Sequence, residues 1–178
     1  MTRLAELSGK TVVILVEEIY NDQEFWYPYY RLQEAGAVVL VAGPRAGGTY
    51  GSKHGLPAVA DVAFGDVDPN AVHGLVLPGG YAPDRIRRDP AALALVRTIF
   101  EQGKPLAHIC HAGWVLASAG VLKGMRTTSF SAIRDDLVNA GAIWEDAAVV
   151  VDRNLISSRA PDDLPDFCRA LVAMLAKG

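Results

Sequence analysis

Four short apolar runs, each about one strand long, constrain the fold of this chain more than any other feature. They occupy 11–16, 37–42, 74–77 and 105–109. Each run is apolar almost throughout instead of alternating with polar residues, which is typical of parallel strands buried on both faces. In the segments between these runs, apolar residues recur at the intervals typical of helices. Strands that alternate with helices predict an α/β protein with a mostly parallel sheet covered on both sides.

Capping residues and glycines set the expected limits of the other elements. Helices are predicted over 24–34, over 90–102 behind an Asp89-Pro90 start, over 112–119, over 131–140 and over 163–176. The glycine-rich stretch 47–61 predicts a hairpin, and 148–151 and 155–157 predict two strands joined by a turn. At 178 residues, we expect one domain spanning 1–178.

Charge and composition argue against several classes of partner. The net charge is -3, and the charged residues are scattered, so we expect no direct binding of nucleic acid. No apolar run approaches the roughly 20 residues that cross a bilayer. The segment 1–10 lacks the apolar core and cleavage site of an export signal. We therefore expect a cytoplasmic protein with no membrane partner.

Cys110 is the strongest candidate for chemistry. It stands between the strand at 105–109 and the helix at 112–119, with almost no loop. Such a turn exposes a side chain above the sheet, as in a nucleophile elbow, and a helix N-terminus is expected to lower the pKa of a thiol. The alternative is a small residue that merely packs at a strand end. The adjoining His111 and a nearby glycine loop favour the nucleophile.

The glycine loop is Pro78-Gly79-Gly80, directly after a neighbouring strand. Its amides, together with the amide of His111, are predicted to form an oxyanion hole. The side chain of His111 is either a general acid or base beside the nucleophile or simply a solvated residue of the first helical turn. The residues alone leave that choice open.

Four carboxylates crowd the loop after the first strand: Glu17, Glu18, Asp22 and Glu24. At most one is expected to point inward, where a buried carboxyl group keeps its proton and donates a hydrogen bond to sulfur.

The remaining histidines and the second cysteine give no sign of a cofactor or metal site. His54, His73 and His108 lack metal-ligand spacing and are predicted to be structural. Cys168 lies among apolar residues of the last helix and is expected to be inert. Because the chain is expected to be cytoplasmic and its two cysteines are far apart in the sequence, we expect no structural disulfide.

Several motifs in fixed order resemble the DJ-1/PfpI superfamily, and within it the branch of PfpI-like intracellular proteases and general stress proteins. The resemblance runs nearly end to end. The residues that carry it are 75–84 (LVLPGGYAPD), 103–105 (GKP) with 109–111 (ICH), 118–122 (SAGVL), 135–141 (DDLVNAG), 149–154 (VVVDRN) and 157–159 (SSR).

The resemblance implies a flavodoxin-like, three-layer α/β/α sandwich, related to that of class I glutamine amidotransferases. It implies that Cys110 is the nucleophile, that Glu24 contacts its sulfur, and that Asp84 of an adjacent subunit pairs with His111. Many relatives have glutamate where this chain has Asp84 and a small residue where it has His108. The resemblance further implies a homo-oligomer, either a dimer or a hexamer.

The function expected from these residues is that of a stress-response cysteine hydrolase acting on a peptide or on an aldehyde-derived adduct. The alternative is a redox-sensing or chaperone-like protein whose Cys110 is oxidised without turnover. A glutamine amidotransferase needs a histidine downstream of the elbow, and none follows His111. No cofactor is expected in either case.

Overall fold

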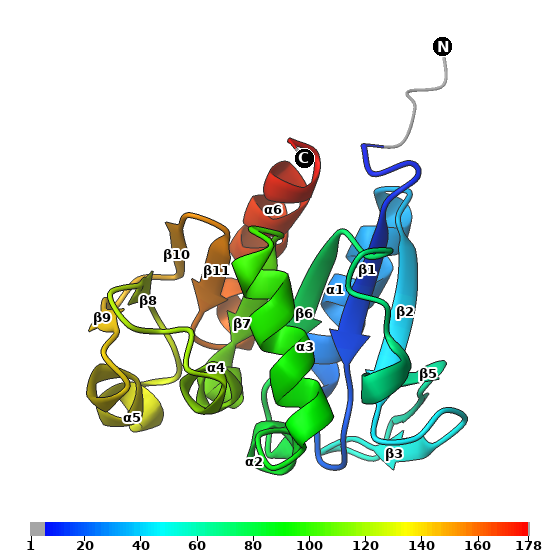
Figure 1. The fold of residues 1–178 in the computed structure, drawn as a ribbon, viewed down its shortest axis with the longest axis horizontal. Helices are drawn as coiled ribbons and strands as arrows, with labels where there is room; N and C mark the ends of the chain where they lie inside the picture. Colours follow the sequence, from blue (N-terminus) through cyan, green and yellow to red (C-terminus); the bar gives the residue numbers. More distant parts are fainter. Residues whose placement is uncertain (1–5, 178) are drawn as a thin grey trace.

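The computed structural model describes residues 6–177, and its centre is one seven-stranded sheet (Figure 1). Six strands run parallel and β10 pairs antiparallel with β11 at one edge. Across the sheet the strands are β10 (Val149–Asp152), β11 (Leu155–Ser158), β7 (Leu106–Ile109), β6 (Gly74–Leu77), β1 (Thr11–Leu15), β2 (Val38–Gly43) and β5 (Val62–Ala63). The predicted parallel sheet is confirmed.

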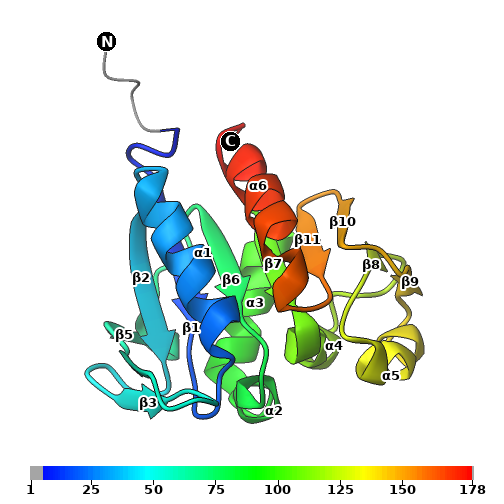
Figure 2. The same cartoon turned by 180° about the vertical axis from the view of Figure 1, so that it is seen from behind.

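Helices cover both faces of this sheet. Two longer helices, α1 (Asp22–Glu34) and α6 (Leu164–Leu175), pack together on the face seen in Figure 2. On the opposite face, toward the viewer in Figure 1, lie α3 (Pro90–Glu101) and α4 (Gly113–Ala119). The three-layer α/β/α arrangement is therefore as expected.

The core follows from the strand composition. Val12 to Leu15 in β1 and Leu75 to Leu77 in β6 are at most 1 % exposed. Burying one such side chain stabilises the fold by roughly 1.5 to 3 kcal/mol. Because β1, β6 and β7 are central, their carboxyl ends meet at one edge of the sheet, at its lower end in Figure 1. Sites in open α/β sheets form at this edge.

Most predicted element boundaries agree with the structure within two residues. The first helix begins at Asp22 instead of residue 24, because the Asn21 side chain caps it by accepting from the amides of Gln23 and Glu24. The predicted hairpin is present as the antiparallel pair β3 (Thr49–Gly51) and β4 (Pro57–Val59).

Several short elements were not predicted. They are α2 (Ala82–Ile86), β5, and the small parallel pair β8 (Arg126–Thr127) and β9 (Ile143–Trp144). The helix expected over 131–140 is divided into a single 3-10 turn (Ser131–Ile133) and α5 (Arg134–Asn139). Segments of two to six residues are too short to show a periodicity.

Within residues 6–177 no helix has the length and apolar character needed to span a membrane. Part of the segment considered for an export signal, residues 1–5, lies outside the described range.

Replacing Asp89 by alanine tests the local basis of α3. The Asp89 carboxylate accepts hydrogen bonds from the amides of Ala91 at 2.8 Å and Ala92 at 3.2 Å. Without it those amides lose their partner, so the free energy of unfolding should fall by about 1 kcal/mol in urea titrations. Glu101→Ala, an exposed change at the other end of α3, is the control and should alter it by less than about 0.5 kcal/mol. Equal effects of the two changes would contradict the capping role.

Candidate active site

Three loops meet at the carboxyl edge of the sheet and are joined by backbone hydrogen bonds. The loop after β1 is bonded to the loop after β6 through Asn21 N to Gly79 O at 3.2 Å and Tyr81 N to Ile19 O at 2.8 Å. It is bonded to β3 through Ile19 N to Gly51 O at 2.7 Å. These bonds join the loops into one rim around the residue that follows β7.

Cys110 follows β7 with a left-handed backbone, at φ 62°. Residues other than glycine rarely adopt this conformation, and it marks the elbow that the sequence predicted. The hydrogen bond from Phe130 N to Cys110 O, at 3.2 Å, holds the turn. The thiol is nearly buried, and its Sγ lies 3.2 Å from Nδ1 of His111. The sharp turn brings these neighbouring side chains together.

Gly79 packs too closely against Cys110 to carry a side chain. A Cβ at this position would lie 2.7 Å from Cys110 Cβ. Its amide donates to Glu24 Oε2 at 2.8 Å and is not available to a substrate. The prediction that Gly79 contributes to an oxyanion hole is therefore wrong. The amides of Gly80 and His111, in contrast, both face the Cys110 sulfur.

Glu24 is the carboxylate that points inward. Its side chain is fully buried, and Oε1 has no hydrogen-bond partner among the described residues. Burial raises the pKa of Glu24 to about 7, and polar contacts with Cys110 and Gly79 oppose this shift only in part. A protonated carboxyl group beside the sulfur can donate a hydrogen bond through Oε1.

The thiol is not activated by its position alone. Burial raises the pKa of Cys110 to about 12, the Glu24 carboxylate adds to the increase, and the amides of Gly80 and His111 offset part of it. The prediction of a lowered pKa is wrong for the resting site. Loss of water outweighs the favourable field of the helix that begins one 3-10 turn later, at Gly113. Forming the thiolate therefore requires a base.

His111 is placed to be that base. Its ring stacks on Phe130 at a centroid distance of 5.0 Å and meets the edge of Trp114 at 5.1 Å. Burial lowers the pKa of His111, and the positive charge of Lys53 lowers it further. The imidazole is therefore neutral near pH 7, and in the tautomer protonated at Nε2 its Nδ1 can accept the thiol proton.

The cavity above the sulfur has a volume of about 490 Å³. Its walls include four residues that the sequence analysis did not select: Ile19, Lys53, Trp114 and Phe130. Ile19, like Cys110, has a left-handed backbone, at φ 64°. No motif marks these positions, because their roles depend on loops that meet only in the folded chain.

Asp84 lies on α2 and does not line the cavity of its own protomer. Its carboxylate pairs with Arg88 at 3.3 Å. That it serves His111 of a neighbouring subunit stays a prediction.

The other histidines have structural partners. His73 Nδ1 accepts from Thr11 N at 3.1 Å, His54 Nδ1 lies 2.9 Å from an oxygen of Asp22, and the buried His108 contacts Thr127 at 2.9 Å. Burial lowers the pKa of His108 to about 3, so it is neutral. Cys168 is buried in α6. Within residues 6–177 no three metal-ligating side chains are grouped together.

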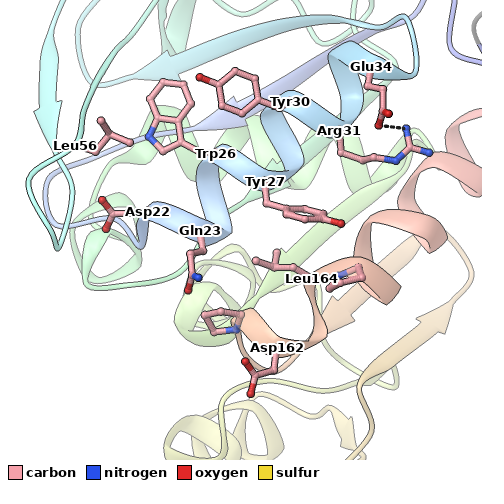
Figure 3. Close-up of a pocket in the computed structure, with 12 residues that line it drawn as sticks. Asp22, Gln23, Trp26, Tyr27, Tyr30, Arg31, Glu34, Leu56, Asp162 and Leu164 are labelled. Carbon is pink, nitrogen blue, oxygen red and sulfur yellow. Dashed lines mark ion pairs between the residues drawn. The ribbon is translucent and has the colours of Figure 1, made fainter.

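A larger hollow of about 850 Å³ lies between α1 and the start of α6 (Figure 3). Tyr27 of α1 points toward Leu164 of α6, and Trp26 and Tyr30, which also line the hollow, lie on the side of α1 nearer Leu56. No cysteine or histidine lines it among the residues that the structure describes, whereas Cys110 and His111 both line the smaller cavity. Pro161 borders both hollows.

An α/β sheet with a cysteine elbow, a neighbouring histidine and a buried glutamate defines the class of this protein. The DJ-1/PfpI family model matches residues 10–174, and the chain belongs to this family. Among solved structures, Drosophila melanogaster DJ-1beta superposes with a TM-score of 0.88 at 29 % identity, covering 95 % of this chain and 91 % of that one.

Curated relatives are similar over almost their whole length. A deglycase of Pyrococcus abyssi is 48 % identical over 164 residues, which is 92 % of this chain and 98 % of the relative. A Bacillus subtilis protein whose name describes it as a candidate cysteine protease is 38 % identical over 167 residues, 94 % of this chain and 99 % of the relative.

Glu24→Gln tests the buried carboxyl group through the pH dependence of stability. A group whose pKa rises from 4.5 unfolded to about 7 folded stabilises the fold fully below pH 4.5, and this contribution is lost as pH rises through 7. Relative to Glu24→Gln, wild type should therefore lose about 2 to 3 kcal/mol of unfolding free energy between pH 5 and pH 8 in urea titrations.

The matched control is Glu18→Gln in the same loop, where the partly exposed carboxylate accepts from Gly51 N. The wild type should show no comparable pH-dependent loss relative to this variant. A difference between wild type and Glu24→Gln that does not change with pH would show that Glu24 is ionised throughout the range.

Proposed function

We propose that this chain is a cytoplasmic stress-response cysteine hydrolase that acts on aldehyde-derived adducts, in the manner of a deglycase or glyoxalase. The observation that carries the proposal is the 3.2 Å contact between Cys110 Sγ and His111 Nδ1 at an elbow where two backbone amides face the sulfur. The deglycase name of the Pyrococcus abyssi relative supports the choice of substrate class. A cavity of about 490 Å³ suits a small adduct.

The first step is addition of sulfur to an electrophilic carbon. Cys110 Sγ bonds to the carbon while its proton passes to His111 Nδ1. The carbonyl oxygen gains the negative charge, and the amides of Gly80 and His111 stabilise it. Glu24, held protonated by burial, donates to the sulfur and adds no second negative charge.

For an amine adduct of a 2-oxoaldehyde, loss of the amine and addition of the thiol give a hemithioacetal on Cys110. The carbinol carbon loses its proton and the keto oxygen gains one, which gives an enediol. The hydroxyl proton on the sulfur-bearing carbon then leaves while a proton is added to the former keto carbon, which gives a thioester of a 2-hydroxy acid. Water then hydrolyses the thioester and restores the thiol. One carbon is oxidised while its neighbour is reduced, so no external redox partner is needed.

Peptide hydrolysis would use the same groups, with His111 returning its proton to the leaving amine. The protease name of the Bacillus subtilis relative supports peptides as a second substrate class. A redox-sensor role has less support, because sensor thiols have a low pKa and burial raises that of Cys110.

Cys110→Ser should abolish turnover of methylglyoxal adducts of N-acetylcysteine, lowering kcat by a factor on the order of 10³ or more. The serine hydroxyl is a far weaker nucleophile in the same position. Release of the 2-hydroxy acid is measured by chromatography. Cys168→Ala, a change to the buried cysteine of α6, is the control and should retain activity. Undiminished turnover by Cys110→Ser would refute the proposal.

The proposed role of Asp84 is tested by mixing inactive variants. If Asp84 completes the site of an adjacent subunit, Asp84→Asn and Cys110→Ser protein should each be inactive alone. After unfolding and refolding together, the hybrid dimers should contain one intact site. About a quarter of the wild-type activity is then expected for equal amounts of a two-fold symmetric dimer.

Cys110→Ser mixed with His111→Ala is the control for this experiment. Cys110 and His111 belong to the same protomer, so no hybrid contains an intact site and no activity should return. Absence of recovery in the Asp84→Asn mixture, or a fully active monomer in sedimentation, would remove Asp84 from the site.

A further inference from the structure

Lys53 is a cation in the wall of the active-site cavity, and the steps above do not use it. It lines the same cavity as Cys110 and His111, and its side chain is exposed. Within residues 6–177 no carboxylate lies within 4.0 Å of its ammonium group. Its charge reaches the reacting groups, because it adds to the effect of burial in lowering the pKa of His111. Lys53 is therefore available to a ligand.

The loop between β3 and β4 holds the backbone of Lys53 in place. Lys53 N donates to Tyr20 O at 2.8 Å, and Tyr20 is fully buried. The Asp22 carboxylate accepts from the Ser52 hydroxyl and lies 2.9 Å from His54 Nδ1. Asp22 therefore ties the loop to the start of α1, where Figure 3 shows it on the side of the loop residue Leu56. The backbone of Lys53 is therefore held at the rim of the cavity, and its side chain extends from there.

The charge balance of the cavity favours an anion. Lys53 is the sole lysine or arginine among the described residues that line it, and Glu24 is the sole carboxylic acid. Burial raises the pKa of Glu24 to about 7, although the positive charge of Lys53 opposes the shift, so this carboxyl group is mostly protonated below pH 7 and about half ionised at pH 7. The nearby carboxylates of Glu18 and Asp22 are engaged by Gly51 N and by the loop. Below pH 7 the cavity therefore has one positive charge that no ionised carboxyl group of its lining balances, and such a cavity attracts negative ligands.

We propose that Lys53 binds a carboxylate of the substrate, close to the carbon that Cys110 attacks. The inference deepens the proposed function, on which it rests, by naming the substrate class. Preferred substrates are adducts that carry an acidic group, such as those on free amino acids, on thiol acids or at a chain terminus. Adducts on neutral internal positions are poorer substrates. Because an ammonium group is a point charge, a phosphate fits the same position.

The experiment uses two substrates that differ only in charge: the methylglyoxal adducts of N-acetylcysteine and of N-acetylcysteine amide. Wild type should prefer the acid by about tenfold in kcat/KM, mainly through KM, since a charge-assisted hydrogen bond is lost with the amide. Lys53→Gln should remove the preference by lowering kcat/KM for the acid substrate alone, and Lys53→Arg should keep the preference. Lys123→Gln, the same charge change after α4, should leave it intact.

Inhibition by inorganic phosphate tests whether the position at Lys53 binds phosphate as well as carboxylate. Competitive inhibition of wild type that disappears in Lys53→Gln assigns phosphate to the same position. No inhibition restricts the position to carboxylates. Equal kcat/KM for the acid and the amide in wild type, or a preference unchanged in Lys53→Gln, would overturn the proposal.

Binding provides a readout that does not depend on turnover. The stable thioethers S-(2-oxopropyl)-N-acetylcysteine and its amide are titrated calorimetrically into Cys110→Ser protein, with and without Lys53→Gln. The acid should bind about tenfold more tightly, and only when Lys53 is present. Such binding without turnover of any adduct would refute the hydrolase and retain the anion site. Turnover of adducts together with equal binding of the two thioethers would refute the anion site and retain the hydrolase.

Discussion

The left-handed backbone at Cys110 is the constraint on which the site depends. An L-residue in this conformation costs roughly 1 to 2 kcal/mol. The packing of β7 between β6 and β11 and the hydrogen bond from Phe130 to the Cys110 carbonyl offset that cost. The elbow directs Sγ toward Gly80 and turns His111 back toward the sulfur. An extended residue here would send the two side chains apart and leave Glu24 buried without a function.

The second determinant is the burial of two acidic groups side by side. Burial opposes the charge of the Glu24 carboxylate and the Cys110 thiolate alike, and each charge disfavours the other. The pair therefore titrates as a unit, and its first ionisation, near pH 7, belongs mainly to the carboxyl group. In the proposed mechanism, Glu24 keeps its proton while the sulfur gives its own proton to His111. The imidazole of His111 contacts the rings of Trp114 and Phe130, and in its neutral form it can accept that proton.

Local patterns accounted for most of the fold. The apolar run at 74–77 became β6, and Asp89-Pro90 began α3 as expected, because strand composition and helix capping act over a few neighbouring residues. The elbow at Cys110 was readable for the same reason. The two-residue strands of β5, β8 and β9 were not, since they are held by partners distant in the sequence.

By itself, the sequence determined the α/β sheet, the cysteine elbow and the glycine loop that faces it. Only the tertiary structure decided which groups surround the sulfur. It assigned the Gly79 amide to Glu24 instead of the substrate, raised the thiol pKa through burial, and brought Lys53 from a distant hairpin to the cavity. Periodicity and capping are short-range properties, whereas desolvation and charge balance depend on everything that surrounds a group after the chain has folded.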